Sequence, residues 1–231
     1  MLPGLDGTGA LHGDFLVALD GAFSSTRVIA YPTDRFLDHA ALEAFVRDAL
    51  PAEDPFVLLG ESFSGPIALA IAASQPANLA GLVLSTTFAR FPTRVLSALS
   101  PLLPIAPVHH APRALLRWWL LGDDATPAQI HALSTTLQRV APTVLRRRSH
   151  AALRVDASAH LDRIRVPTLY LRGRRDRLVS RAAGESLRTS LPDCTLVDIA
   201  GPHLLLQAAP QACARAVIDF ARRLPASRRI A

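Results

Sequence analysis

No charged residue occurs between Ser62 and Ala89, and this uncharged stretch constrains the fold more than any other feature of the chain. A helix that crosses a membrane needs about 20 consecutive apolar residues. Polar residues and a proline within 74–78 divide the stretch, and neither half reaches that length. The pattern therefore predicts a buried helix followed by a buried strand, with no integral membrane segment.

Apolar runs and amphipathic stripes alternate along most of the chain. Half of the 231 residues are hydrophobic and 19% are charged, which is enough apolar surface for one globular domain. Short β-rich runs between helical stripes are typical of an α/β fold, a mostly parallel sheet with helices on both faces. We expect helices over the stripes at 41–50 and 213–224. We expect strands at 27–31, 55–60, 79–85, 168–171 and 195–199.

The alternation stops between about Phe91 and Arg165. This part contains no clear strand, and it has helical stretches such as 114–121 and prolines at positions 101, 104, 107 and 112. We interpret residues 91–160 as a helical insertion into a core that residues 1–90 and 161–231 form. The residues from 225 to 231 are expected to fray.

All 25 basic residues are arginines, because the chain contains no lysine. The composition therefore excludes a P-loop lysine, a Schiff-base lysine and a pyridoxal phosphate anchor. Residues 1–88 carry 3 Arg against 10 acidic residues, whereas residues 89–231 carry 22 Arg against 9. A basic second half could attract an anionic partner, but no nucleic-acid module accompanies it. We expect a solvated surface and no nucleic-acid partner.

The cysteine and histidine content predicts neither a disulfide framework nor a metal site. Cys194 and Cys213 are too few for such a framework, and no His/Cys cluster has the spacing of zinc ligands. His109 and His110 are adjacent instead of four residues apart, which disfavours a metal pair. No signal peptide is visible. We expect a cytoplasmic protein without a cofactor, and the sequence indicates no particular oligomeric state.

The strongest chemical signal lies within residues 60–64, where an apolar run turns directly into an Ala-rich helix. A nucleophile elbow needs this arrangement, with small residues two positions before and after the strained central residue. Gly60 and Ser64 meet this requirement for Ser62, whereas Ser64 as the nucleophile would have the bulky Pro66 as its second neighbour. The alternative is a serine that only caps the helix.

A nucleophilic serine needs a base and an acid that orients the base. Asp176 follows the fourth expected strand, and His203 follows the fifth. Loops at the carboxyl ends of parallel strands meet at one edge of the sheet, which is the edge where Ser62 is expected. We predict Ser62 as the nucleophile, His203 as the base and Asp176 as the acid.

Other carboxylates are weaker candidates for the acid. Asp162 and Asp193 precede their strands, and Asp198 lies inside one. Three arginines within 174–177 flank Asp176, and nearby positive charge would favour its ionised form.

A tetrahedral intermediate needs preorganised donors for its negative charge. We expect one donor to be the main-chain N–H of Phe63, directly after the nucleophile. The second is expected from the glycine-rich loop 2–9, as the N–H of Leu5, because glycines permit close approach of the backbone. A phosphate-binding loop is the alternative, and the glycine spacing and the absence of lysine disfavour it.

These motifs together resemble the α/β-hydrolase superfamily over nearly the full length of the chain. The loop Leu2-Pro-Gly-Leu-Asp-Gly-Thr-Gly9 is similar to the oxyanion loop of a subgroup with bacterial esterase-like proteins and relatives of plant phytyl ester synthases. The segment 60–65 resembles the elbow, with Ser64 where the family usually has glycine, and Asp176 and His203 resemble the acid and base. The resemblance implies that the insertion at 91–160 is a helical cap.

Two further expectations follow from the resemblance. The family has a strand before the oxyanion loop, whereas only Met1 to Pro3 precede Gly4, so we expect the native chain to start several residues upstream. The cap would roof the active site. Its residues Trp118 and Trp119, neighbouring leucines and the stretch 99–108 offer apolar surface for an acyl chain, although they could instead pack the cap onto the core.

The residues together predict a cofactor-free serine hydrolase that cleaves a carboxylic ester or thioester of a small or acyl-chain substrate through an acyl-enzyme. An acyltransferase would use the same triad, with an alcohol or thiol in place of water. A non-catalytic binding protein with the same fold is the alternative from a different class.

Overall fold

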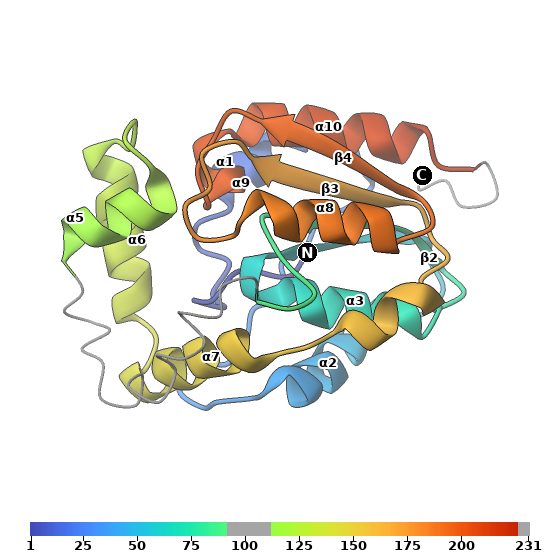
Figure 1. The fold of residues 1–231 in the computed structure, drawn as a ribbon, viewed down its shortest axis with the longest axis horizontal. Helices are drawn as coiled ribbons and strands as arrows, with labels where there is room; N and C mark the ends of the chain where they lie inside the picture. The colour runs from blue at the N-terminus through green and yellow to red at the C-terminus, as the bar shows by residue number, and fades with distance from the viewer. Residues whose placement is uncertain (92–111, 226–231) are drawn as a thin grey trace.

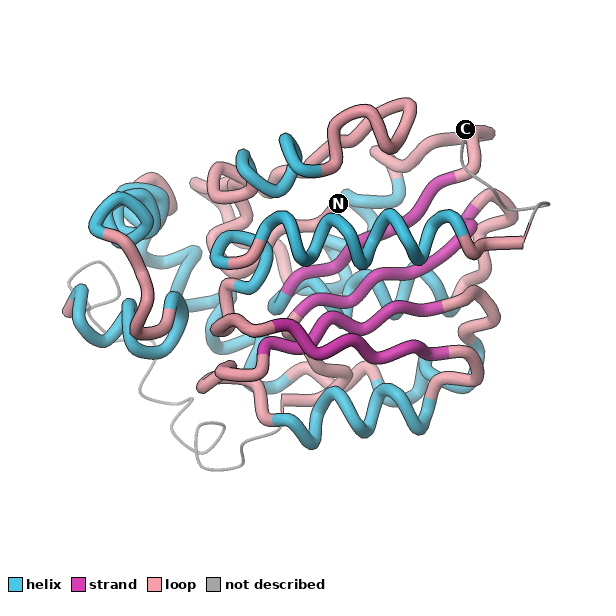
Figure 2. Tube along the Cα trace, turned by 90° about the horizontal axis from the view of Figure 1, so that it is seen from above, coloured by secondary structure: helices cyan, strands magenta, loops and turns pink. Residues whose placement is uncertain are grey.

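A parallel sheet of four strands forms the centre of the molecule. The computed structural model describes residues 1–91 and 112–225. The strands lie in the order β1-β2-β3-β4, and every neighbouring pair is parallel (Figure 2). Their bounds are Phe56–Glu61 for β1, Leu79–Ser85 for β2, Thr168–Gly173 for β3 and Cys194–Ile199 for β4.

The sheet confirms four of the five expected strands, each to within two residues. Nearly all residues of β1 and all residues of β2 are buried, because helices cover both faces. The register pairs Glu61 with Ser85 and Leu171 with Val197. Since all strands run in the same direction, the segments that follow them meet at one edge of the sheet, which we call the carboxyl edge.

Helices pack on both faces of this sheet (Figure 1). Their bounds are Gly13–Ala18 for α1, His39–Arg47 for α2, Gly65–Ala73 for α3, Arg181–Ser190 for α8 and Pro210–Arg222 for α10. On one face α2, α3 and α8 bury Leu42, Ile67 and Leu187 in a common core. On the other face α1 and α10 bury Phe15 and Val217. The expected α/β fold with helices on both faces is therefore confirmed.

Between β2 and β3 the described chain contains helices and no strand. They are α5 (Arg113–Leu116), η4 (Arg117–Leu121), α6 (Pro127–Gln138), α7 (Pro142–Arg154) and η5 (Ser158–Arg163). Thr126 and Gln129 form a capping box that starts α6. Figure 1 shows α5 and α6 beyond the carboxyl edge, while α7 runs back beside α2. The division into a core and a cap at residue 91 and residue 160 stays a prediction.

The prediction of a strand at residues 27–31, the first of the five expected strands, is wrong. The N–H groups of Ile29 and Tyr31 donate to the main-chain carbonyls of Met1 and Gly7, at 3.0 and 2.7 Å. Within the described chain these contacts reach a loop and do not continue as a ladder, so the β-rich composition of this segment has no neighbouring strand to pair with.

The first residues of the chain lie beside β1. The N–H of Leu2 donates to the carbonyl of Leu59 at 2.7 Å, and the N–H of Glu61 donates to the carbonyl of Leu2 at 3.2 Å. This parallel pairing directs the following residues to the carboxyl edge. The loop of residues 3–9, which we call the oxyanion loop, therefore starts next to Ser62.

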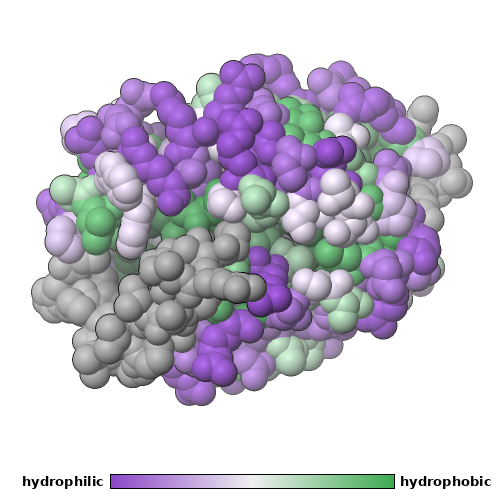
Figure 3. Space-filling view, in the orientation of Figure 1, coloured by the Kyte–Doolittle hydropathy of each residue, from purple (hydrophilic) through white to green (hydrophobic). Residues whose placement is uncertain are grey.

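The described surface is largely hydrophilic over α8 and α10 in the view of Figure 3, with hydrophobic patches between the polar side chains. Among residues 1–91 and 112–225, no helix combines the length and the apolar character that crossing a membrane requires. The stretch 99–108, His109, His110 and the tail after residue 225 lie outside the described residues.

Candidate active site

Ser62 lies at a tight turn between β1 and α3. Its φ of 48° is in the left-handed region, which a non-glycine residue adopts only where the surroundings enforce it. A side chain at Gly60 would place its Cβ 2.7 Å from the Cβ of Ala68, and one at Gly65 would place it 1.9 Å from Oγ1 of Thr87. The turn is thus closed tightly on both sides, and Ser62 projects at the carboxyl edge as a nucleophile elbow requires.

Three side chains from separate loops form a hydrogen-bonded chain at this edge. Oγ of Ser62 lies 2.8 Å from Nε2 of His203, and Nδ1 of His203 lies 3.0 Å from Oδ2 of Asp176. In the neutral ring Nδ1 donates to the carboxylate, which leaves Nε2 to accept from the serine. The structure therefore brings together all three residues that the sequence singled out for the triad.

Main-chain groups of its own loop hold Asp176. Its Oδ1 accepts from the N–H groups of Leu178 and Val179, at 2.8 and 2.9 Å, which leaves Oδ2 for His203. Two of the flanking arginines, which were expected to favour its ionised form by their charge, pair with other carboxylates. Arg175 and Arg177 form ion pairs with Asp124 and Asp123, which precede α6, at 2.7 and 2.6 Å.

The electrostatic surroundings of His203 favour its protonated form. The side chain is only 2% exposed, and burial alone would lower its pKa. The charge of Asp176, its hydrogen bond and the charge of Glu61 outweigh burial and raise the pKa of His203 above 6.5. A base with a raised pKa takes a proton more readily from the serine hydroxyl.

Two main-chain amides are available for an oxyanion. The N–H groups of Leu5 and Phe63 donate no hydrogen bond to another described residue. The N–H of Gly7 donates to the carbonyl of Gly4 at 3.1 Å, which turns the loop beside Leu5. Gly7 and Gly9 both have a φ of 74°, a conformation that suits glycine. The glycine-rich loop was singled out from the sequence for this property.

His12 and Glu61 form a buried pair that contacts the oxyanion loop. The ring of His12 lies 2.8 Å from Oε2 of Glu61 and 3.2 Å from the carbonyl of Gly9, and both contacts are satisfied when both ring nitrogens carry a proton and the ring is cationic. Burial lowers the pKa of His12, but Glu61 raises it more strongly. Burial raises the pKa of Glu61, but His12, Gln207 and the charge of His203 lower it below its ordinary value.

Two further side chains contact the loop, and sequence reasoning missed their roles. The hydroxyl of Ser64 donates to the carbonyl of Pro3 and lies 2.7 Å from that of Tyr31. Arg148 of α7 reaches the loop from the region between β2 and β3. A signal for Arg148 existed, because it stands four residues from Val144 and four from Ala152, on the buried face of the helix.

The weaker candidates for the acid lie away from Ser62. Asp162 and Asp193 are exposed and precede their strands. Both carboxylate oxygens of Asp198 accept from Arg172, at 2.7 and 2.8 Å. Ser64, the competing nucleophile, is fully buried.

Trp118 and Trp119 lie near the triad but are not enclosed. Trp118 is 50% exposed, and its ring stacks under the guanidinium of Arg177, whose carbon is 4.9 Å from the ring centre. The two tryptophan rings are 6.3 Å apart. The carbonyl of Leu120 accepts from the N–H of Leu204, beside His203, at 2.8 Å. This segment therefore contacts the loops that carry the acid and the base.

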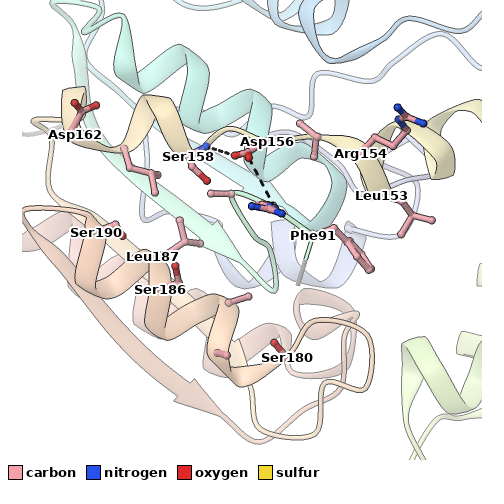
Figure 4. A pocket seen from close by; sticks show the side chains of 16 residues that line it. Phe91, Leu153, Arg154, Asp156, Ser158, Asp162, Ser180, Ser186, Leu187 and Ser190 are labelled. Atoms are coloured by element: carbon pink, nitrogen blue, oxygen red, sulfur yellow. Dashed lines mark hydrogen bonds and ion pairs between the residues drawn. The ribbon is translucent and has the colours of Figure 1, made fainter. Parts of the chain in front are cut away.

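No triad residue lines either of two hollows in the described structure. A cavity of about 980 Å³ lies between α8 and the segment from Leu153 to Asp162 (Figure 4). A smaller one of about 200 Å³ is lined by Leu11, Leu121 and Leu204 among others, and Leu204 directly follows His203. In the described ranges no group of three or more His, Cys, Asp or Glu side chains is placed to hold a metal ion.

The fold and the site define an α/β hydrolase. Residues 27–206 match the family described as serine aminopeptidase, S33, and the chain belongs to this family of α/β hydrolases. It is therefore a hydrolase.

Individual relatives fit this assignment. The pimeloyl-[acyl-carrier protein] methyl ester esterase of Aromatoleum aromaticum is 32% identical over 201 residues, which are 78% of this chain and 80% of that protein. Among solved structures, a hydrolase from Pseudomonas aeruginosa PA01 has a TM-score of 0.78 at 23% identity, with 94% of this chain and 86% of that chain covered. The esterase EaEST from Exiguobacterium antarcticum has a TM-score of 0.81 at 14% identity, with 95% and 90% covered. The two solved structures show the fold alone.

Proposed function

We propose that this hydrolase is a serine esterase with Ser62, His203 and Asp176 as its catalytic triad. The observation that carries the proposal is the continuous hydrogen-bonded chain from the hydroxyl of Ser62 through the ring of His203 to the carboxylate of Asp176, with distances of 2.8 and 3.0 Å. The strained backbone of Ser62 supports it, because such strain occurs at functional sites.

In the proposed reaction, Oγ of Ser62 attacks the ester carbonyl while Nε2 of His203 takes the hydroxyl proton. The oxyanion that forms accepts from the N–H groups of Leu5 and Phe63. His203 then gives its proton to the departing alcohol, which leaves an acyl group on Ser62. Water attacks this acyl-enzyme with His203 again as the base, and a carboxylic acid is released. Asp176 orients the ring and stabilises its charged form. The mechanism needs no cofactor.

The substrate class that we propose is the ester of an acyl chain with a small alcohol. The hollow of about 200 Å³ is lined in part by Leu204, which directly follows His203, and its leucines could contact a short apolar group. The printed name of the Aromatoleum relative, a methyl ester esterase, makes methyl esters the first substrates to test. Trp118 and Trp119 do not line this hollow, and we propose that they bind acyl substrate further out, as part of a cap formed by residues 91–160.

Labelling with a fluorophosphonate probe, followed by peptide mapping, tests this function without a known substrate. We expect modification at Ser62 that is lost in His203→Ala. Ser62→Ala should abolish turnover of methyl and p-nitrophenyl esters without unfolding the protein, whereas Ser64→Ala should retain substantial turnover. The reverse result for the two serines would show that the nucleophile has been assigned wrongly.

The alternatives give different results in the same experiment. An acyltransferase would be labelled at Ser62, but a small alcohol or thiol acceptor would compete with water for the acyl group. A non-catalytic binding protein would fold and remain unlabelled. We also propose a cytoplasmic location, since Cys194 and Cys213 are both free thiols as a reducing compartment would keep them.

A further inference from the structure

Arg148 is the most unusual buried side chain of the described protein. It stands on α7 with no exposed surface, and it is the largest of the fully buried side chains. Charged side chains are rarely buried completely, because removing a charge from water is costly unless polar groups replace the water. The groups around Arg148 should therefore indicate why a charge is kept there.

Main-chain carbonyls of two core segments surround its guanidinium. Nη1 donates to the carbonyls of Leu5 at 3.2 Å and Asp6 at 2.7 Å, and Nη2 donates to that of Pro32 at 2.8 Å. Among the described residues Arg148 forms hydrogen bonds only with these carbonyls, while the buried carboxylate of Asp6 accepts from Thr8 and acts on Arg148 through its charge. The direct partners of Arg148 are thus backbone oxygens, two of them in the oxyanion loop.

The contact leaves the loop little freedom to move. A side chain at Gly7 would place its Cβ 2.4 Å from Nη1 of Arg148, so the loop backbone lies directly against the guanidinium. The carbonyls of two consecutive residues, Leu5 and Asp6, both point at Nη1. The two carbonyls fix the peptide groups Leu5–Asp6 and Asp6–Gly7. The N–H of Leu5, the proposed oxyanion donor, belongs to the preceding peptide group, whose Gly4 carbonyl accepts from the N–H of Gly7 at 3.1 Å, so Arg148 acts on it through this turn.

We propose that Arg148 is a positioning residue for ester hydrolysis, which holds the oxyanion loop in the conformation that presents the N–H of Leu5. This inference rests on the proposed function. The planar fork of an arginine reaches three carbonyls at once, which neither lysine nor an apolar side chain can do.

Kinetics of Arg148→Met and Arg148→Lys on p-nitrophenyl butyrate test the proposal, with Arg147→Met as the matched control. Arg147 is the exposed neighbour on the same helix, over the ring of Phe36. We expect kcat to fall about 100-fold in Arg148→Met and about 10-fold in Arg148→Lys, with KM changed by less than about threefold. The control should keep kcat to within about twofold.

A butyl trifluoromethyl ketone separates a positioning role from general damage. This ketone forms a hemiketal with Ser62 whose oxygen is negative, so it measures the oxyanion site directly. Its inhibition constant should rise in Arg148→Met by about the same factor as kcat/KM falls. Hydrogen exchange of the amides in residues 4–8 should become faster in Arg148→Met and stay unchanged in Arg147→Met.

The kinetic and inhibition results separate a failure of the positioning role from a failure of the proposed function. A folded Arg148→Met that keeps kcat and the ketone affinity within about threefold of the wild type overturns the proposal. Where Arg148→Met does not fold, Arg148→Lys decides: an increase in KM without a loss of kcat overturns the proposal as well. If the wild type is neither labelled at Ser62 nor active on esters, the proposed function fails and the positioning role fails with it, whereas a labelled and active wild type with an unaffected Arg148→Met overturns the positioning role alone.

Discussion

Two groups of residues flank Ser62, and they are held in place by different means. We call the pair of His203 and Asp176 the proton-transfer side and the loop of residues 3–9 the oxyanion side. On the proton-transfer side, Asp176 accepts from N–H groups two and three residues further along its own loop. On the oxyanion side, the loop of residues 3–9 is held by Ser64, His12 and Arg148, and the last of these is 143 residues away from Leu5 in sequence.

This difference has consequences for stability as well as for chemistry. A side chain held by its own loop can be replaced with little effect on the rest of the fold. The buried polar groups around the oxyanion loop depend on one another, and removing one leaves its partners without hydrogen bonds in a dry environment. Substitutions on the proton-transfer side should therefore change activity alone, whereas substitutions beneath the oxyanion loop should change activity and stability together.

Asp176→Asn should have the largest effect on activity and almost none on stability. The amide oxygen can still accept from Leu178 and Val179, but the NH₂ group would face Nδ1 of His203 and favour the wrong tautomer. We expect kcat on p-nitrophenyl butyrate to fall about 10⁴-fold. Asp162→Asn, at an exposed carboxylate, is the control. A loss of kcat smaller than tenfold would exclude Asp176 as the acid of the triad.

Glu61→Gln should show the opposite balance, with a large loss of stability. The side chains of Glu61 and His12 are 1% and 0% exposed, and the substitution leaves the buried imidazolium without its partner. Breaking a buried ion pair costs about 3–5 kcal/mol. Urea unfolding measures this cost. The matched control is Glu43→Gln, whose partner Arg47 is partly exposed and whose loss should cost less than about 1 kcal/mol.

The pH dependence of the free energy of unfolding tests whether the ion pair of His12 and Glu61 is the source of this loss of stability. His12 has a raised pKa, so its stabilisation is complete below pH 6.5 and is lost as the pH rises through the pKa in the folded state. Glu61 has a lowered pKa, so its stabilisation is present above pH 4.5 and is lost as the pH falls through the folded pKa. The stability difference between wild type and Glu61→Gln should therefore be greatest between these two values. A difference that does not become smaller as the pH rises through the folded pKa of His12 would contradict the ion pair.

The acid limb of the pH profile of kcat/KM reports the protonation of His203, the base on the proton-transfer side. His203 must be neutral to act as the base, so kcat/KM should rise with pH through a midpoint above 6.5 and fall tenfold for each pH unit below it. Burial lowers the pKa of His203, and the charges of Asp176 and Glu61 raise it by more. Glu61→Gln should shift the midpoint to lower pH. A midpoint that does not move would show that Glu61 acts on the oxyanion side only.

The same contrast explains what the sequence could predict. Ser62, Asp176 and His203 each directly follow a strand that is recognisable from its own residues, so their meeting at the carboxyl edge could be predicted, although their catalytic roles stay predictions. The prediction of a strand at residues 27–31 is wrong. A strand also needs a neighbouring strand to pair with, and the sequence of the segment itself does not specify one. The spacing of Arg148 from Val144 and Ala152 indicated a buried position, but its contact with the loop could not be predicted, since its partners are backbone carbonyls.

Ser64→Ala should have the smallest effect, and it tests how far the oxyanion side depends on a single contact. The substitution removes the hydrogen bond to the carbonyl of Pro3 and leaves the hydroxyl of Tyr31 without its partner. We expect a loss of about 1–2 kcal/mol in stability and of less than about threefold in kcat, because Arg148 still holds Leu5.

A double-mutant cycle with Tyr31→Phe makes this expectation quantitative. If the two hydroxyls stabilise one another, the double variant should unfold with a loss smaller than the sum of the two single variants, because no buried hydroxyl is then left unpaired. Strict additivity would show that Ser64 and Tyr31 act independently. A loss of kcat in Ser64→Ala as large as that in Arg148→Met would mean that the loop needs every one of its contacts, so that the oxyanion side behaves as one cooperative unit.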